Sequence, residues 1–246
     1  MRRFLLLPAL LLLTLSAHLA QAQNLRAARE HLQRGLARFG RGDVRGAINE
    51  YNKAIEADPR YAEAYLNRGV ARRARGDLDG AIDDYEKAVE LEPRLGQNNR
   101  DITQAYTNRG FIRSNELDLD GAIADFNKAI KYSPNDADSY IKRGRALLIG
   151  GDTKSALADF DRGIGLDPNN PLAYADRGMA LRRQGREADA AKDFEKSMKL
   201  NREMRLMIEL HIMELEMQIR EMQRRRRDAM QEKVARSLIV MNNRSA

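Results

Sequence analysis

The chain of 246 residues contains no cysteine, no tryptophan and only three histidines. Without cysteine it forms no disulfide, holds no iron–sulfur cluster and has no thiol nucleophile. His31 and His211 are the histidines of the body, and they lie too far apart in sequence for a closely spaced metal site or a Ser/His/Asp set. Glycine loops of the phosphate-binding kind are absent as well. The sequence therefore predicts no catalytic residues, no metal and no cofactor. Its many carboxylates do not exclude a catalytic acid–base pair, but no motif singles one out.

Long apolar runs are scarce too, and the one that exists stands at the start. Phe4 to Leu15 is almost entirely apolar and follows Arg2 and Arg3, and Ala20-Gln21-Ala22 supplies small residues for a cleavage site. This order is typical of a secretory signal peptide over residues 1–22, cleaved after Ala22. The run is short for a helix that must cross about 30 Å of hydrocarbon. We expect an exported, periplasmic protein; the alternative is an uncleaved signal that anchors the chain in the inner membrane.

The rest of the chain is repetitive. The pair Arg-Gly occurs five times, and in each case an alanine follows the glycine by 12 residues and an aromatic ring follows that alanine by four. A proline follows the first four glycines by 24 residues. The five glycines are Gly35, Gly69, Gly110, Gly144 and Gly178.

This pattern predicts two helices in each repeat, joined by a tight turn. The turn is usually Gly-Asp, as at Gly76-Asp77, because glycine tolerates the left-handed conformation that ends a helix and aspartate caps the next one. Alanine and the later aromatic ring, four residues apart, lie on one helical face. Proline interrupts helix continuation between repeats.

The units resemble tetratricopeptide repeats, which have small residues and aromatic rings at these offsets in a 34-residue unit. The resemblance implies an all-α, right-handed superhelical solenoid of five helix-turn-helix repeats, plus a long C-terminal helix. Residues 23–201 hold the repeats, at about 28–61, 62–95, 103–136, 137–170 and 171–201, with an insertion near 94–101. We expect that insertion either to lengthen a helix or to form a loop.

Three departures from the repeat pattern stand out. His31 takes the place of a tyrosine found in the other four repeats, and Arg202 replaces the terminal proline in the fifth. Leu117 stands where a glycine ends the first helix of the third repeat, so we expect a looser turn there.

An arginine precedes each glycine, and an acid precedes each later aromatic ring. We expect the two to form an ion pair between the helices of one repeat. The arginines are Arg34, Arg68, Arg109, Arg143 and Arg177, and the acids are Glu50, Asp84, Asp125, Asp159 and Asp193.

The resemblance also implies that the first helix of each repeat lines a concave groove that binds a peptide or a helix of a partner protein. Asparagine can hydrogen-bond a peptide backbone, and arginine or lysine favours acidic groups. The predicted partner-binding residues are Asn67, Arg73, Asn108, Lys142, Arg145 and Arg182.

Residues 202–236 contain no glycine or proline and read as one long helix, with a flexible tail at 237–246. Ile208, Ile212, Leu215, Ile219 and Met222 form a heptad seam, and Leu206, Leu210, Met213 and Met217 form a second stripe beside it. One interpretation is a cap on the last repeat. The other is a docking helix, with homo-oligomer formation through residues 202–222.

Four consecutive arginines, Arg224 to Arg227, follow this seam in a chain of formal net charge +7. The simplest interpretation is a solvated charge run, and weak contact with an acidic membrane surface is a second one. We do not expect nucleic acid as a partner, because no aromatic residues interleave the cluster and the repeats are close to neutral.

Taken together, the sequence predicts a non-catalytic scaffold or adaptor for protein–protein interaction in the bacterial cell envelope. The alternative is a structural protein that self-assembles through its C-terminal helix.

Overall fold

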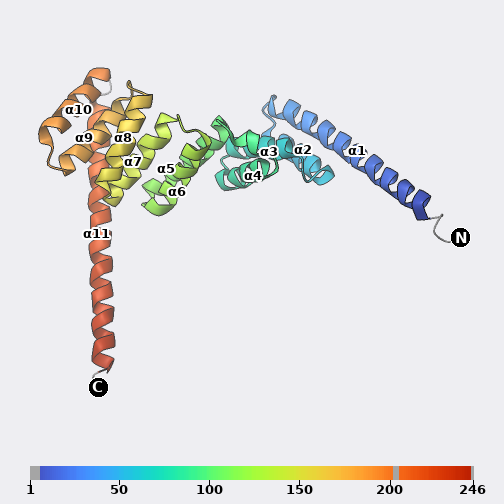
Figure 1. Ribbon diagram of the computed structural model, residues 1–246. Helices are drawn as coiled ribbons and strands as arrows, with labels where there is room; N and C mark the ends of the chain where they lie inside the picture. Colours follow the sequence, from blue (N-terminus) through green and yellow to red (C-terminus); the bar gives the residue numbers. More distant parts are fainter. Residues whose placement is uncertain (1–5, 202–204, 245–246) are drawn as a thin grey trace. The chain divides into compact units, whose positions relative to one another are not determined.

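The computed structural model describes residues 6–201 and 205–244, and every regular element within them is helical (Figure 1). The predicted all-α fold of helix-turn-helix repeats with a long C-terminal helix is confirmed. Residues 1–5 of the predicted signal peptide lie outside the described residues, as do Arg202 and the ends of the predicted C-terminal segments. The elements are α1 Leu6–Phe39, α2 Val44–Ala57, α3 Ala62–Ala74, α4 Leu78–Leu91, the short 3-10 helix η1 Pro93–Gly96, α5 Arg100–Asn115, α6 Leu119–Tyr132, α7 Ala137–Gly150, α8 Thr153–Leu166, α9 Pro171–Arg183, α10 Glu187–Leu200 and α11 Arg205–Arg244.

The turn inside each of the first four repeats follows the same local chemistry, whereas in the fifth repeat Arg186 precedes α10 without a side-chain cap. Gly76 has a φ of +87°, and the side chain of Asp77 accepts a hydrogen bond from the Gly80 N–H at 3.1 Å, which caps α4. Leu117 adopts the same left-handed conformation, with a φ of +64°. The turn that follows it also ends with an aspartate cap, since Asp118 accepts from Gly121 at 3.1 Å. The looser turn expected at Leu117 is therefore not observed.

The insertion before the third repeat forms both a turn and additional helix. Residues 93–96 make the 3-10 helix η1, and Asn98 has a φ of +50°. The side chain of Asn99 then accepts from the Asp101 and Ile102 N–H groups at 3.0 and 3.2 Å. This cap starts α5 at Arg100, three residues before the repeat boundary expected at residue 103.

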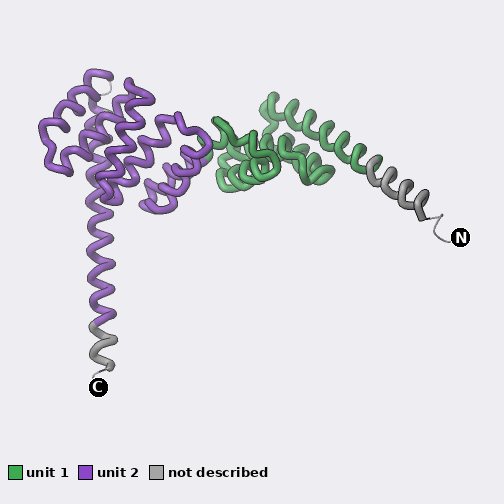
Figure 2. Tube along the Cα trace, viewed as in Figure 1, with its two compact units in different colours: residues 1–105 green, residues 106–246 purple. Residues whose placement is uncertain are grey.

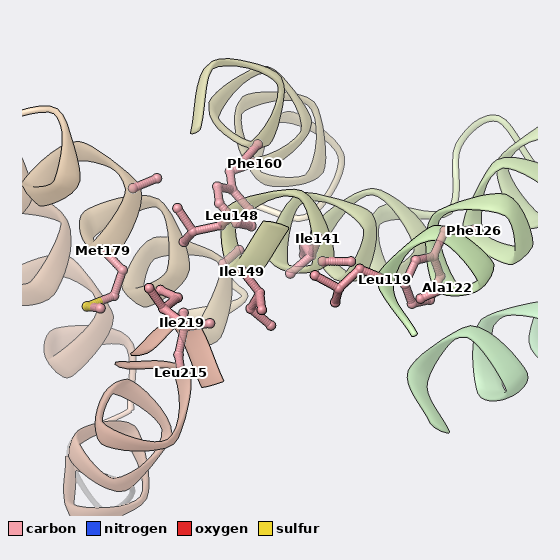
Figure 3. Packing of buried hydrophobic residues seen from close by; sticks show 14 residues of the cluster. Leu119, Ala122, Phe126, Ile141, Leu148, Ile149, Phe160, Met179, Leu215 and Ile219 are labelled. Carbon is pink, nitrogen blue, oxygen red and sulfur yellow. The ribbon is translucent and has the colours of Figure 1, made fainter. Parts of the chain in front are cut away.

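The chain divides into two compact units, residues 1–105 and 106–246, each with a core of its own (Figure 2). In unit 1, α1 pairs with α2 and α3 pairs with α4, and α1, α2 and α3 share a cluster that includes Leu32, Ile48 and Tyr51. In unit 2, α7 pairs with α8 and α9 pairs with α10, around a larger cluster that includes Phe126 and Phe160 (Figure 3).

Close approach of the paired helices depends on glycine. At Gly144, an added Cβ would stand 2.8 Å from Cε1 of Phe160, well inside van der Waals contact. The ring of the second helix therefore packs directly on the backbone of the first. The Arg-Gly repeat in the sequence marks this contact.

The C-terminal helix α11 ends at Arg244, beyond residue 236 where the sequence pattern placed its end. It packs chiefly on α7 and α9 and meets α10 only marginally. Figure 3 shows Leu215 and Ile219 of α11 beside Met179 of α9 and Ile149 of α7. The helix thus covers the first helices of the fourth and fifth repeats and does not continue the stack from α10.

Candidate functional site

Most of the charge that recurs from repeat to repeat is structural. The guanidinium of Arg68 binds both oxygens of Asp84, at 2.9 and 2.6 Å, and Asp84 is only 2% exposed. The same arginine lies over the ring of Tyr65, 5.4 Å from its centroid. The predicted pairing is confirmed in four repeats, Arg68–Asp84, Arg109–Asp125, Arg143–Asp159 and Arg177–Asp193. These groups join the two helices of a repeat and leave little charge for a ligand.

The first repeat is the exception, and the pairing predicted there is wrong. Arg34 lies 3.6 Å from Glu30, whereas Glu50 is bound by Nδ1 of His31 at 2.8 Å and by Lys53 at 3.2 Å. The reason is the replacement of tyrosine by His31, which removes the ring that supports the arginine and supplies an imidazole in its place. The hydrogen bond to His31 and the charge of Lys53 lower the pKa of Glu50.

Two of the predicted partner-binding residues lie in unit 1, on α3. The side chain of Asn67 donates to the backbone oxygen of Glu63 at 2.7 Å, one turn earlier in its own helix. Arg73 donates to Asp101 at 2.5 Å and to Gln104 at 3.3 Å, so its charge is engaged at the start of α5. Both side chains remain partly exposed.

Two more, Asn108 on α5 and Lys142 on α7, lie on an accessible part of unit 2. Asn108 is exposed, and on the same helix Phe111 and Ile112 are 39% and 46% exposed. The ammonium of Lys142, which is paired with Asp138, lies 5.7 Å from the centroid of the Phe111 ring. An amide, an aromatic ring, a branched apolar side chain and a cation thus stand together, which we call the open patch.

The remaining two are both linked to α11, Arg182 directly and Arg145 through Asp176. Arg145 of α7 donates to Asp176 of α9 at 3.4 Å, and the other oxygen of Asp176 is bound by Nε2 of His211 of α11 at 2.6 Å. Asp176 is fully buried. Burial alone would raise its pKa, but the charge of Arg145 and the hydrogen bond to His211 outweigh burial and lower it. Arg182 of α9 pairs with Glu216 of α11.

Asp176 and His211 were not among the predicted site residues. A signal for Asp176 existed, because it stands two residues before Gly178, where Asn67 and Asn108 precede their own glycines. For His211 there was no signal, since its place depends on where α11 docks.

The apolar seam of α11 forms the rest of this contact. Ile208, Leu215 and Ile219 are 0%, 1% and 5% exposed, and Ile212 and Met222 pack against the cluster that contains Leu215 and Ile219. The second stripe of the helix stays open to solvent, with Leu206, Leu210, Met213 and Met217 between 48% and 66% exposed. One face of α11 is therefore packed on the rest of unit 2, and the adjacent apolar face is exposed to solvent.

The arginine cluster is only partly free. Arg224 and Arg225 contact Glu221 at 2.9 and 3.0 Å, and Arg226 reaches the turn at Gly151 between α7 and α8. Within the described part of the chain, no helix has both the length and the apolar composition needed to cross a membrane.

Comparison with known proteins places these features in a family context. A sequence model described as Tetratricopeptide repeat matches residues 32–96, 115–171 and 151–200. No match was found among curated proteins. Among solved structures, a crystal structure of the MamA protein is 25% identical, with a TM-score of 0.57 over 72% of this chain and 93% of that chain.

Two further structures share the fold. One is YrrB, described as a TPR protein with an unusual peptide-binding site, at 19% identity and a TM-score of 0.56, covering 75% of this chain and 90% of that one. The other is MamA from Desulfovibrio magneticus RS-1, at 20% identity and a TM-score of 0.54, covering 72% and 96%.

Proposed function

This chain belongs to the tetratricopeptide repeat family, and on that premise we propose that it is a non-catalytic scaffold that binds a peptide segment or a helix of a partner protein in the bacterial cell envelope. The observation that carries the proposal is the open patch of unit 2. Phe111 and Ile112 are exposed apolar side chains beside the amide of Asn108 and the cation of Lys142. Aromatic anchors with polar neighbours are typical of the residues that dominate protein–protein binding.

Site-specific photocrosslinking tests this proposal. We expect a photoreactive residue at Phe111 to capture a discrete partner protein in cells. The matched control is the same residue at Ala158, an exposed position on α8. Lys142→Glu should reduce capture from Phe111 about tenfold or more, whereas Lys154→Glu, an exposed lysine on α8, should not. Equal capture from both positions would contradict the proposal.

The envelope location rests on the signal peptide and is tested separately. Residues 19–24 are exposed along α1, and the first buried side chain of that helix within the described residues is Ala28. Residues 19–22, the part of the signal peptide whose side chains are described, therefore make no buried contact that cleavage would remove. We expect the protein purified from the periplasm to begin at Gln23, as checked by intact mass. A chain that keeps its first residue and fractionates with the inner membrane would support the anchored alternative.

A second candidate function, self-assembly, is favoured by the uncovered stripe of α11. Truncation at Asn201 would not separate the two functions, since it would also remove α11 from α7 and α9. Point variants separate them better. A self-assembling protein should exceed the mass of a single chain in light scattering and return to that mass in Met213→Glu/Met217→Glu. The control Gln223→Glu/Gln231→Glu adds the same charge at exposed polar positions of the helix and should leave the mass unchanged.

A further inference from the structure

The contact made by α11 differs from the way in which repeats stack on one another. Within unit 2, the first helix of a repeat packs on the second helix of the repeat before it, as α9 does on α8. A cap that continued the array would pack on α10 in the same manner. Instead, α11 lies on α7 and α9. These are the first helices of the fourth and fifth repeats, and the family resemblance assigns the first helix of each repeat to the binding groove.

The contact has both the apolar and the polar parts of a specific binding site. Ile208, Leu215 and Ile219 are buried at steps of seven and four residues, as when an amphipathic helix lies in an apolar groove. Leu215 and Ile219 belong to the same buried cluster as Leu148, Ile149 and Met179 (Figure 3).

Polar contacts fix the register of this helix on unit 2. His211 binds the fully buried Asp176, and Glu216, five residues later, binds Arg182. Arg145 holds the other side of Asp176. Two of the six residues predicted to bind a partner are thus already engaged by a segment of the same chain. Arg182 is bound by it directly, and Arg145 is linked to it through Asp176.

We propose that residues 208–222 of α11 are a tethered ligand that occupies the groove of the fourth and fifth repeats and must leave before a partner helix binds there. The partner is an amphipathic helix of another protein with the same pattern, namely apolar residues at steps of three and four, an imidazole or a cation opposite Asp176, and an acid opposite Arg182. This inference rests on the proposed function, and it specifies both the partner class and the regulation of the site.

The competition can be measured with a fluorescein-labelled synthetic peptide of residues 205–223 as the partner mimic. In the full-length chain the tethered helix fills the site, and apparent affinity falls with the fraction of molecules in which the site is free. Leu215→Asp/Ile219→Asp detaches α11, so we expect the peptide to bind this variant at least tenfold more tightly than wild type. The control Met213→Asp/Met217→Asp places the same charges on the exposed stripe and should bind like wild type.

A charge exchange tests the register. A peptide carrying Glu216→Arg should bind the detached variant at least tenfold more weakly than the unmodified peptide. Adding Arg182→Glu to that variant should restore the affinity, because the pair is re-formed with its signs reversed. Absence of restoration would overturn the assigned register.

A measurement on the unaltered chain covers the case in which the detached variant fails to fold. Excess unlabelled peptide should speed hydrogen exchange of amides in residues 208–222 at least threefold while α7 and α9 stay protected. Unchanged exchange at saturating peptide, or equal peptide affinity for wild type and a folded detached variant, would overturn the inference. Neither result touches the proposed function, which is contradicted when capture from Phe111 is absent or no greater than capture from Ala158.

Discussion

At the scale of single residues, the turn glycine Gly76 and the helical glycine Gly165 have opposite requirements. Gly76 has a φ of +87° and Gly165 lies within α8, and an added Cβ would meet no atom within 4 Å at either position. Gly76→Ala should therefore lower the free energy of unfolding by about 1 kcal/mol through backbone strain alone. Gly165→Ala should raise it by up to about 1 kcal/mol through helix propensity. Urea titration followed by circular dichroism gives both values, and the same sign for the two would refute the argument.

The repeated ion pair supports a second prediction at this scale. Asp84 is buried between Arg68 and Arg72, whose guanidinium nitrogens lie 2.6 and 2.9 Å from its oxygens. Asp84→Ala leaves two half-buried cations without their acid and should cost about 3 kcal/mol of unfolding free energy. The neighbouring Asp83→Ala removes an exposed carboxylate and should change stability by less than about 0.5 kcal/mol. Similar losses in the two variants would show that the pair is not the cause.

The same residues show how far sequence reasoning reaches. Four ion pairs were predictable because arginine and acid recur at fixed offsets on facing helices. The first repeat could not be predicted by analogy, because replacing one tyrosine by His31 changed both the support for Arg34 and the partner of Glu50. The repeat pattern therefore predicts the ion pair that most repeats share. It does not predict the pairing in a repeat where one ring is replaced, as by His31 in the first.

At the scale of elements, the docking of α11 makes the two stripes of one helix energetically different. Leu215 is 1% exposed and Met213 is 56% exposed. Leu215→Ala should destabilise unit 2 by about 2–5 kcal/mol, because it removes buried methyl groups and leaves a cavity. Met213→Ala should cost less than about 0.5 kcal/mol. The midpoint of urea unfolding distinguishes the two, and equal shifts would mean that α11 does not dock in solution.

The paired helices of the repeats were predictable, whereas the place of α11 was not. Gly-Asp and proline positions fix where helices start and stop by local chemistry, and these signals predicted the paired helices of each repeat. A heptad seam indicates that a helix is covered on one side, but it carries no information on the surface that covers it. The contacts of α11 with α7 and α9 join residues far apart in sequence, so only the folded chain reveals them.

At the scale of the whole molecule, α11 is the element that ties distant parts of the sequence together. Most packing within each unit joins consecutive helices, as expected for a repeat protein whose units contact their neighbours. The contacts of α11 with α7 and α9 join helices that are not consecutive, and the buried carboxylate of Asp176 on α9 is bound by both Arg145 of α7 and His211 of α11. The stability of this contact should therefore depend on the charge of that one group.

The sign of the pH dependence follows from the direction of the shift. The pKa of Asp176 is lowered in the folded chain by Arg145 and His211, against an unfolded value of about 3.9. A group whose pKa is lowered in the folded state contributes stability that is fully present at pH values above its unfolded-state pKa. That stability is lost as the pH falls through its folded-state pKa. Asp176→Asn should cost about 1.5–3 kcal/mol at pH 7, and the difference from wild type should shrink below about pH 4. Asp83→Asn, at an exposed position of α4, should differ little from wild type at any pH. A difference for Asp176→Asn that stays constant from pH 7 to pH 3 would mean that the carboxylate charge does not hold α11 in place.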